Sequence, residues 1–329
     1  MESDSIINKI KEITNDEETK HIGYGALSLV YYVPKTNSII KCFEISNETD
    51  VEIKLYKKMK KTRENFPNQI ERLSIPNEIF YMKHNKKKYC CLEIPCYESD
   101  LKKFDIKNCS IEQKKIFINQ LRQGVFEMHL MGYYHGDLKK ENICISSGED
   151  GKKEIKIIDF GLSDKIENEI MEYRLKNTFK DASPIQVLNH LGRFIRTCPF
   201  DDKEKKCTCK EDKEVMKRLI KSLEKNGVKL YANTLHETDI IVKEKCMIND
   251  MFVVGCLIYY IITGETFFNE SIDEMIEETI EFLENPEKFV DEKINKYKDE
   301  TNEGVFNIFK LTIMGYIKNI KEFTKIYKN

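Results

Sequence analysis

The sequence contains no tryptophan and no marked excess of charge of either sign. Its 329 residues include 54 basic and 56 acidic side chains, which gives a formal net charge of −2. A chain this balanced lacks the strong positive field with which proteins bind nucleic acids or anionic membranes. Short basic runs at residues 57–61 and 86–88 are typical of solvated surfaces. We therefore expect neither a nucleic acid nor a membrane as a partner.

Signals for secretion and membrane insertion are also missing. Residues 1–10 lack the basic and apolar regions of a signal peptide. The longest apolar run, residues 252–262, is too short to cross a bilayer and fits a buried helix. The 11 cysteines are scattered, and several lie in apolar segments where a free thiol packs as a small hydrophobic group. These are Cys42, Cys90, Cys144 and Cys256. We expect a reducing, intracellular compartment, the cytoplasm.

The order of the predicted elements indicates a small β-rich part followed by a larger helical part. The first part contains predicted strands at 26–33 and 38–45, a predicted helix at 49–61 and a predicted hairpin at 78–94. From Ser110 onward, a capping-box pattern and apolar residues at helical spacing predict a long helix over 114–134. We predict an α+β fold with two lobes, 1–94 and 95–329.

Residues 135–164 carry the strongest functional signal. Two short loops in this stretch hold four polar side chains, and a predicted β-hairpin, with strands at 141–146 and 154–160, joins the loops. The four residues are Asp137, Lys139, Asn142 and Asp159. Polar groups that converge in this way suit the binding of Mg-nucleotide phosphates beside an acceptor hydroxyl. The sequence therefore predicts phosphoryl transfer.

The loop His-Gly-Asp-Leu-Lys-Lys-Glu-Asn at 135–142 resembles the catalytic loop of eukaryotic-type protein kinases, and Asp-Phe-Gly at 159–161 resembles their metal-binding motif. The resemblance implies that Asp137 orients the acceptor hydroxyl and takes its proton. It implies that Lys139 neutralises charge on the transferred γ-phosphoryl group. Asn142 and Asp159 would be the ligands of Mg²⁺ or Mn²⁺.

The N-terminal part carries a second resemblance to this family. Residues 22–30 resemble the glycine-rich strand-turn-strand that covers ATP phosphates, with Ser28 in place of the third glycine. The ATP-binding residues implied here are Ile22, Gly23, Tyr24, Gly25, Ser28 and Val30. Lys41 ends a strand that resembles the family's Val-Ala-Ile-Lys strand, so it would bind the α- and β-phosphates. Ile39 would line the adenine pocket.

Lys41 needs a carboxylate partner, and the predicted helix at 49–61 offers Glu52, with Glu48 as the alternative. Residues 91–104 resemble the joint between the two kinase lobes. The adenine-binding residues implied by this joint and by the pocket floor are Ile94, Pro95, Cys96, Tyr97 and Cys144. The residue that guards the back of the pocket is Ile94 if the joint needs no gap and Glu93 otherwise. The resemblance covers about residues 18–270.

Three features depart from the family pattern. Gly136 replaces the arginine of His-Arg-Asp, so regulation by phosphorylation of the activation loop is not expected. The Ala-Pro-Glu anchor is not clear, and Ser183-Pro184-Ile185 stands at its expected distance. An extra segment occupies about 198–245, and a zinc site there is an open alternative to free thiols. Its candidate ligands are Cys198, Cys207, Cys209 and either Cys246 or His190.

The sequence thus resembles an ATP-dependent serine/threonine protein kinase, with ATP and a protein substrate as partners. Lys139 in the His-x-Asp-Leu-Lys loop favours serine or threonine over tyrosine as acceptor. The alternative is a pseudokinase that acts as a binding or scaffolding module through the segment at about 198–245. The composition suggests an AT-rich coding genome, and the His-Gly-Asp variant of the loop fits a large DNA virus or a parasite as the source. Nothing in the sequence predicts an oligomeric state.

Overall fold

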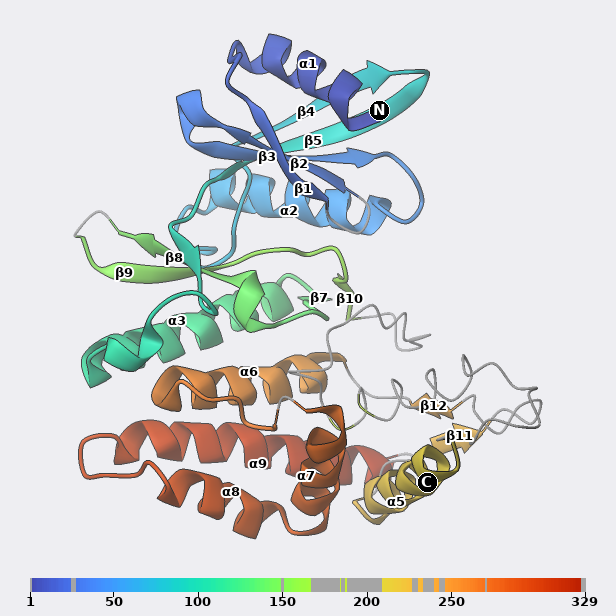
Figure 1. Cartoon of the computed structure of the whole chain (residues 1–329), viewed down its shortest axis with the longest axis vertical. Helices are drawn as coiled ribbons and strands as arrows, with labels where there is room; N and C mark the ends of the chain where they lie inside the picture. The colour runs from blue at the N-terminus through green and yellow to red at the C-terminus, as the bar shows by residue number, and fades with distance from the viewer. Residues whose placement is uncertain are drawn as a thin grey trace. The chain divides into compact units, whose positions relative to one another are not determined.

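The computed structural model describes residues 2–24, 28–148, 151–166, 184, 187, 209–226, 230–232, 240–242, 246–269 and 271–326. Contacts between residues divide the chain into two compact units. The first comprises Met1–Phe104 and Asn119–Asp164, and the second comprises Asp105–Ile118 and Lys165–Asn329. Figure 1 shows the elements of both units. The boundary expected between residues 94 and 95 stays a prediction.

The first unit contains an antiparallel sheet of five strands in the order β1-β2-β3-β5-β4. The strands are β1 (Lys20–Tyr24), β2 (Ser28–Val33), β3 (Ser38–Glu44), β4 (Glu78–His84) and β5 (Lys87–Pro95). A short 3-10 helix, η1 (Pro34–Thr36), connects β2 to β3. The predicted strands at 26–33 and 38–45 and the predicted hairpin at 78–94 are confirmed by β2, β3 and the β4–β5 pair.

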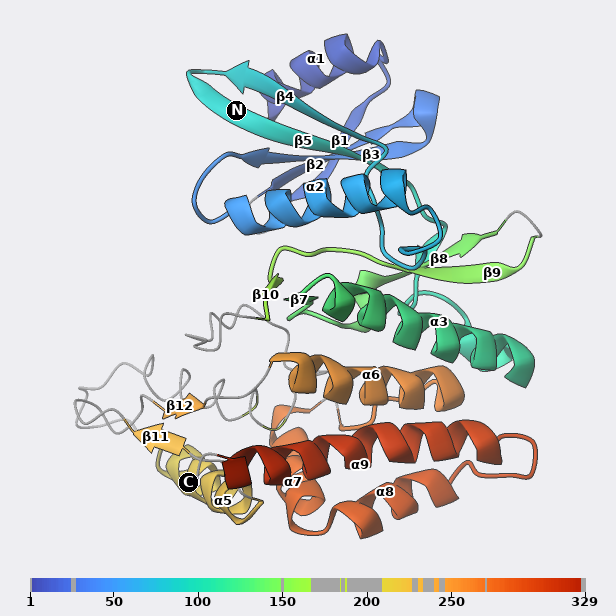
Figure 2. The same ribbon diagram turned by 180° about the vertical axis from the view of Figure 1, so that it is seen from behind.

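Helix α1 (Glu2–Thr14) covers one face of this sheet, and α2 lies on the opposite face (Figures 1 and 2). Ile6 and Ile10, one helical turn apart on α1, are fully buried in one cluster with Ile40 and Cys42 of β3. The sequence prediction omitted α1. The spacing of its isoleucines is that of an amphipathic helix and could have indicated it.

Helix α2 (Asp50–Asn65) confirms the predicted helix at 49–61 and extends it by four residues. Its N-terminus is fixed by Thr49, whose hydroxyl donates to the carbonyl of Glu44 at 2.9 Å. The side of α2 that faces the sheet is buried, and it contains Glu52, Ile53, Leu55, Tyr56 and Met59. This face therefore places an acidic side chain next to the strand that carries Lys41.

The rest of the first unit contains the hairpin predicted between the two polar loops. Its strands are β8 (Ile143–Ser147) and β9 (Lys153–Ile157), and β6 (Ser99–Asp100) joins them in a three-stranded sheet. Strand β9 ends at Ile157, so Asp159 lies beyond the strand rather than in it. Strand β7 (Tyr133–Tyr134) and the 3-10 helix η3 (Lys140–Asn142) also belong to the first unit, whereas α3 (Ile111–Leu130) and β10 (Asp164–Lys165) have residues in both units. The 3-10 helix η2 (Ile106–Asn108) belongs to the second unit. Ser110 caps α3, because its hydroxyl accepts the N–H of Gln113 at 3.1 Å.

The second unit is mainly helical. Its elements are α5 (Cys209–Lys225), β11 (Leu230–Ala232), β12 (Ile240–Val242), α6 (Cys246–Thr263), α7 (Ile272–Glu284), α8 (Pro286–Asn295) and α9 (Glu303–Ile326). Helix α6 contains the apolar run at 252–262, as predicted. In the core of this unit the ring of Phe282 packs against those of Phe252 and Phe267, with centroids 5.9 Å apart in each pair.

The predicted α+β fold is confirmed, since antiparallel strands dominate the N-terminal part and helices dominate the C-terminal part. Helix α5, which begins at Cys209, lies within the extra segment identified at about 198–245. Within the ranges given above, no helix is both long enough and apolar enough to cross a bilayer.

Candidate active site

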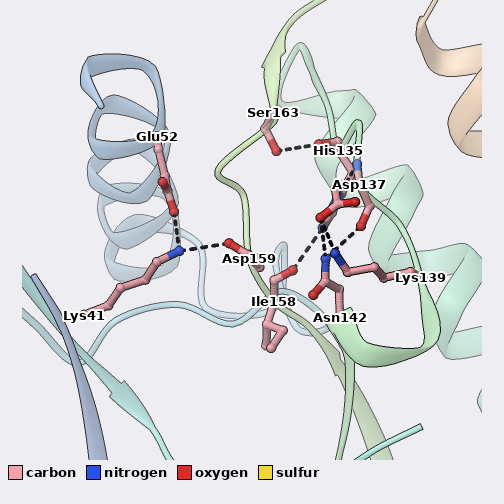
Figure 3. Close-up of polar contacts among 9 residues, drawn as sticks. All are labelled: Lys41, Glu52, His135, Asp137, Lys139, Asn142, Ile158, Asp159 and Ser163. Atoms are coloured by element: carbon pink, nitrogen blue, oxygen red, sulfur yellow. Dashed lines mark hydrogen bonds and ion pairs between the residues drawn. The ribbon is translucent and has the colours of Figure 1, made fainter. Parts of the chain in front are cut away.

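Lys41 lies at the centre of an ion-pair network in the first unit (Figure 3). Its Nζ lies 2.9 Å from Oε1 of Glu52 and 2.9 Å from Oδ1 of Asp159. Burial alone would lower the pKa of Lys41, but the negative charges of Glu52 and Asp159 outweigh burial and raise this pKa above its ordinary value. Lys41 is therefore a fixed cation held between two elements.

Glu52 is 6% exposed, on the buried face of α2. Burial raises the pKa of Glu52, and the positive charge of Lys41 offsets only part of this effect. The carboxylate therefore depends on Lys41 as its partner. The pair expected from the sequence is present, whereas Glu48 is exposed and precedes α2.

The loop at 135–142 brings Asp137, Lys139 and Asn142 together. Nζ of Lys139 donates to Oδ2 of Asp137 at 2.7 Å, and Nδ2 of Asn142 donates to the same oxygen at 3.1 Å. Nδ2 of Asn142 also donates to the backbone carbonyl of Asp137 at 2.8 Å. Because the amide nitrogen is committed to Asp137, Oδ1 of Asn142 is the atom of this side chain that can bind a cation.

Asp137 is a buried carboxylate, 8% exposed. Burial raises the pKa of Asp137, and the hydrogen bond and positive charge of Lys139 offset part of that rise. A carboxylate with a raised pKa accepts a proton more readily than an exposed aspartate does. The loop therefore holds a group suited to general-base catalysis beside a cation.

Asp159 has a left-handed backbone conformation, with φ of 63°. The next residue, Phe160, is fully buried, and its ring centroid lies 5.4 Å from that of Tyr56 and 5.4 Å from that of His135. This packing turns Phe160 into the core and leaves the Asp159 side chain 44% exposed beside Lys41. Burial alone would raise the pKa of Asp159, but Lys41 outweighs it and lowers this pKa, so the carboxylate is ionised at neutral pH.

Gly136 lies where the chain after Asp159 approaches the loop at 135–142. Its φ is 76°, and a Cβ atom there would lie 2.6 Å from the backbone oxygen of Leu162. One residue farther on, Oγ of Ser163 donates to the carbonyl of His135 at 3.0 Å. A side chain at position 136 would displace Leu162, which gives a physical reason for the glycine found where the kinase pattern has arginine.

The glycine-rich segment occupies β1 and β2. Ile22 and Tyr24 are 54% and 72% exposed, and Gly23 has open space where a side chain would lie. Gly25 lies outside the described residues. The exposed positions around Gly23 leave room for a ligand beside this strand.

Ser28 and Val30 begin β2, on the face of the sheet that also carries Lys41. Val30 lies directly opposite Lys41 in the β2–β3 ladder. Ser28 is 8% exposed, and its hydroxyl has no hydrogen-bond partner among the described residues. A buried hydroxyl without a partner costs about 1–3 kcal/mol, so Ser28 is suited to bind a ligand oxygen.

The register of β3 and β5 decides which residue lies beside Lys41. Ile94 is paired with Ile39, two residues from Lys41, so its side chain is on the Lys41 face. Glu93 is paired with Ile40 on the α1 face, where it accepts a hydrogen bond from the hydroxyl of Ser38 at 2.9 Å. Of the two residues considered from the sequence, Ile94 is the one that shares the face of the sheet with Lys41.

After Ile94, successive backbone groups point alternately toward β3 and away from it. The N–H of Cys96 donates to the carbonyl of Asn37 at 3.2 Å, so Cys96 faces β3 and the carbonyl of Pro95 points away from it. Tyr97 is anchored by its own hydroxyl, which donates to Oγ of Ser74 at 2.8 Å. Cys144 of β8 is buried and paired with Asp100 of β6.

Two residues of the site were not singled out from the sequence. Tyr56 follows Glu52 by one helical turn and supports Phe160, so helical spacing on α2 could have indicated it. His135 was treated only as part of a motif, although it contacts both Phe160 and Asp137.

A separate metal centre finds no support in the described ranges, where no group of three or more histidine, cysteine or acidic side chains could hold a metal ion. Three of the five candidate ligands of the zinc site considered from the sequence lie outside these ranges. Cys198, Cys207 and His190 lie outside the described residues, and so does about half of the segment at 198–245.

The sequence was compared with known proteins. It matches the family described as protein kinase domain over residues 17–184. Cyclin-dependent kinase F-3 of Oryza sativa subsp. japonica is 27% identical over 157 residues, which are 45% of this chain and 33% of the relative. CBL-interacting protein kinase 26 of the same plant is 30% identical over 154 residues, 44% of this chain and 29% of the relative.

A shorter match is closer in sequence. Serine/threonine-protein kinase ksp1 of Schizosaccharomyces pombe is 50% identical over 56 residues, 16% of this chain and 12% of the relative. The matched part of the chain thus spans 33% or less of the length of these curated relatives.

Proposed function

Because the chain belongs to the protein kinase family, we propose that it is an active enzyme that transfers the γ-phosphoryl group of ATP to a serine or threonine hydroxyl of a protein. The observation that supports activity is the network in which Lys41 bridges Glu52 and Asp159 at 2.9 Å each. The roles below are those that the residues are suited to by position and charge.

Asp159 and Asn142 are the proposed ligands of Mg²⁺ or Mn²⁺. Both offer oxygen atoms, which these cations prefer, and the Asp159 side chain is 44% exposed and ionised. Asn142 is fixed by its bonds to Asp137, so its amide oxygen is held in place. The cation, when bound, would neutralise charge on the phosphates of ATP.

Lys41 is the proposed cation for the α- and β-phosphates. Its ammonium group is already oriented by Glu52, so little side-chain entropy is lost when phosphate binds. The hydroxyl of Ser28, buried and without a partner among the described residues, can donate to a phosphate oxygen. This donor would replace what the third glycine of the family pattern offers through its backbone.

Asp137 is the proposed general base for the acceptor hydroxyl. Its raised pKa favours proton transfer from that hydroxyl, and Lys139 at 2.7 Å can stabilise charge on the transferred group. A base of this kind contributes about 10²–10⁴-fold to the rate.

The adenine ring is proposed to lie against the apolar Lys41 face of the sheet. The side chains proposed to contact the adenine ring are Ile22, Val30, Ile39 and Ile94 of this sheet and Cys144 of β8. The carbonyl of Pro95, which points away from β3, and the N–H of Tyr97 are the backbone groups proposed to bind the ring edge. The choice of serine or threonine rests on Lys139 and on the name of the ksp1 relative.

The proposal is tested with radiolabelled ATP, Mg²⁺ and generic basic and acidic proteins, using the full chain, Asp159→Asn and the matched control Asp273→Asn. Asp273 is an exposed aspartate at the start of α7. We expect label transfer by the wild type and the control and its loss in Asp159→Asn. Phosphoamino-acid analysis of the product then identifies the acceptor.

Equal background labelling in all three proteins would contradict the proposal and favour the pseudokinase alternative. That alternative depends on the segment at 198–245, about half of which lies outside the described residues. Phosphotyrosine as the only product would retain the kinase and reject the serine/threonine assignment. The intracellular location stays a prediction.

A further inference from the structure

We propose that Cys42 and Cys91 are a redox-active pair, which a small disulfide such as glutathione disulfide converts into a disulfide across β3 and β5. This inference concerns the sheet of the first unit and does not depend on the proposed kinase activity. Both residues are free thiols in the structure, and their Sγ atoms lie 2.7 Å apart.

The pairing of the strands places these two residues directly opposite each other. In this ladder the N–H of Ile45 donates to Lys88 and the N–H of Cys96 donates to Asn37. Hydrogen-bonded pairs alternate with non-hydrogen-bonded pairs along antiparallel strands, so the Cys42–Cys91 pair is a non-hydrogen-bonded one. Such pairs have Cα atoms about 4.5 Å apart, within the range of about 4.4–6.8 Å that a disulfide spans.

The geometry also selects this pair from the neighbouring thiols. Cys90 precedes Cys91 in sequence but is paired with Phe43, so its side chain points to the opposite face of the sheet. Among the other described thiols, Cys96 and Cys109 are half-buried and belong to other elements. Cys42 is therefore the partner of Cys91, and Cys90 serves as a control position on the opposite face of the same strand.

The reaction is a two-electron exchange. The thiolate of one cysteine attacks glutathione disulfide, which forms a mixed disulfide and releases one glutathione thiol. The thiolate of the second cysteine attacks the protein sulfur of the mixed disulfide and releases the second glutathione thiol. Two protein thiols are oxidised, one glutathione disulfide is reduced to two glutathione thiols, and the two protons lost by the protein end on those thiols.

Burial controls the rate of this exchange. Cys42 and Cys91 are 1% and 0% exposed, beneath Ile6 and Ile10 of α1. Burial, followed by the hydrogen bond to Cys91, raises the pKa of Cys42. Since the thiolate is the reactive form, the pair reacts more slowly than Cys109, whose side chain is partly exposed.

The oxidised pair is expected to stabilise the sheet without changing the site. A link between residues 42 and 91 restricts the unfolded chain, and the Tm of the protein should rise by several degrees. The sulfur atoms are already in contact, so the strands need little movement. Lys41 points to the opposite face of β3, so its pair with Glu52 should persist.

The test is to incubate the full chain in a glutathione redox buffer at alkaline pH until the thiol content stops changing. Free thiols are then alkylated, and the protein is digested and mapped. We expect a peptide pair linked through Cys42 and Cys91, an intact mass lower by two hydrogens at that pair, and a raised Tm that a reductant reverses. Cys90→Ala should keep the link, and Cys42→Ala should lose both the link and the rise in Tm.

An Ile10→Ala variant separates the rate of oxidation from its equilibrium, because the smaller side chain makes the two thiols more accessible to glutathione disulfide. It should reach the same end point as the wild type in less time. The proposal is wrong if Cys42 and Cys91 are both alkylated at the end point in the wild type and in Ile10→Ala. It is also wrong if Cys91 is linked to a cysteine other than Cys42.

Discussion

The backbone N–H of Asp137 donates a hydrogen bond to Nδ1 of His135 at 3.2 Å. Nδ1 therefore carries no proton, and Nε2 must donate the bond that it makes with the carbonyl of Ile158 at 3.0 Å. One imidazole thus connects the loop that holds Asp137 to the residue before Asp159. The ring acts beside the bond from the N–H of Ile158 to the carbonyl of Asn142 at 2.9 Å, so both contacts fix the loop relative to the residue before Asp159.

Replacing His135 by phenylalanine tests this connection. The ring would still pack against Phe160, but the N–H of Asp137 and the carbonyl of Ile158 would lose their partner. We expect a loss of about 1–3 kcal/mol in unfolding free energy for each group left unpaired. Urea unfolding followed by far-UV circular dichroism measures it, since the chain has no tryptophan to report by fluorescence. A change below about 0.5 kcal/mol, the usual size for surface substitutions, would mean that the two bonds do not hold the loop.

Replacing Lys41 by methionine should destabilise the fold as well as abolish activity. The variant leaves the carboxylate of Glu52 buried without its cation, which typically costs about 3–5 kcal/mol. The double variant Lys41→Met/Glu52→Gln removes the uncompensated charge, so it should be more stable than the single variant at neutral pH. Urea unfolding of the two variants makes the comparison.

The stability difference between Lys41→Met and Lys41→Met/Glu52→Gln should also depend on pH, in a direction that the pKa of Glu52 determines. The pKa of Glu52 in the folded state is raised above the ordinary value of 4.5, and loss of Lys41 raises it further. A group of this kind favours the folded state fully below its unfolded pKa and loses this contribution as pH rises through the folded pKa. The difference in unfolding free energy between the single and the double variant should therefore widen as pH rises from about 4.5. A constant gap would show that Glu52 is not the group responsible.

Lys139 should set the acid limb of the activity profile. Burial raises the pKa of Asp137, and the ammonium group of Lys139 lowers it in part. Activity that needs ionised Asp137 falls as pH drops through this pKa. In Lys139→Ala the lowering effect is absent, so the acid limb of kcat/KM should move to higher pH, in addition to any loss of rate. A limb that stays in place or moves to lower pH would argue against Asp137 as the base.

Gly136 and Gly151 form a matched pair of positions with positive φ. Their φ angles are 76° and 75°, but a Cβ at Gly136 would lie 2.6 Å from the oxygen of Leu162, whereas nothing lies within 4 Å at Gly151. Gly151→Ala should cost about 1–2 kcal/mol for the left-handed backbone alone. Gly136→Ala should cost clearly more in urea unfolding, because Leu162 must also move. Equal costs would show that Leu162 adapts freely.

Most of the site was predictable because its parts are local in sequence. Asp137, Lys139 and Asn142 share one loop, and the hairpin that follows brings Asp159 back to it. Glu52 was predictable from helical spacing, since it shares the buried face of α2 with Leu55 and Tyr56. Local spacing restricts where such groups can lie.

Features that depend on distant pairing were not predictable in this way. The contact between Cys42 and Cys91 requires that β3 lie beside β5 in one particular register, across 49 positions of sequence. The choice between Ile94 and Glu93 depended on the same register, since a shift of one residue exchanges the two faces of a strand. The tautomer of His135 depends on a carbonyl 23 residues away. These contacts follow from the fold, and no short motif carries them.

The cover that α1 provides has a practical consequence for anyone who shortens this protein. A truncated version beginning at Lys20, the first residue of β1, would lack Ile6 and Ile10 and bare the apolar side of the sheet around Tyr31, Ile40 and Met82. Exposed apolar sheet surface promotes self-association. Such a truncation is therefore expected to aggregate even though every residue proposed for catalysis is retained, so expression boundaries should include α1.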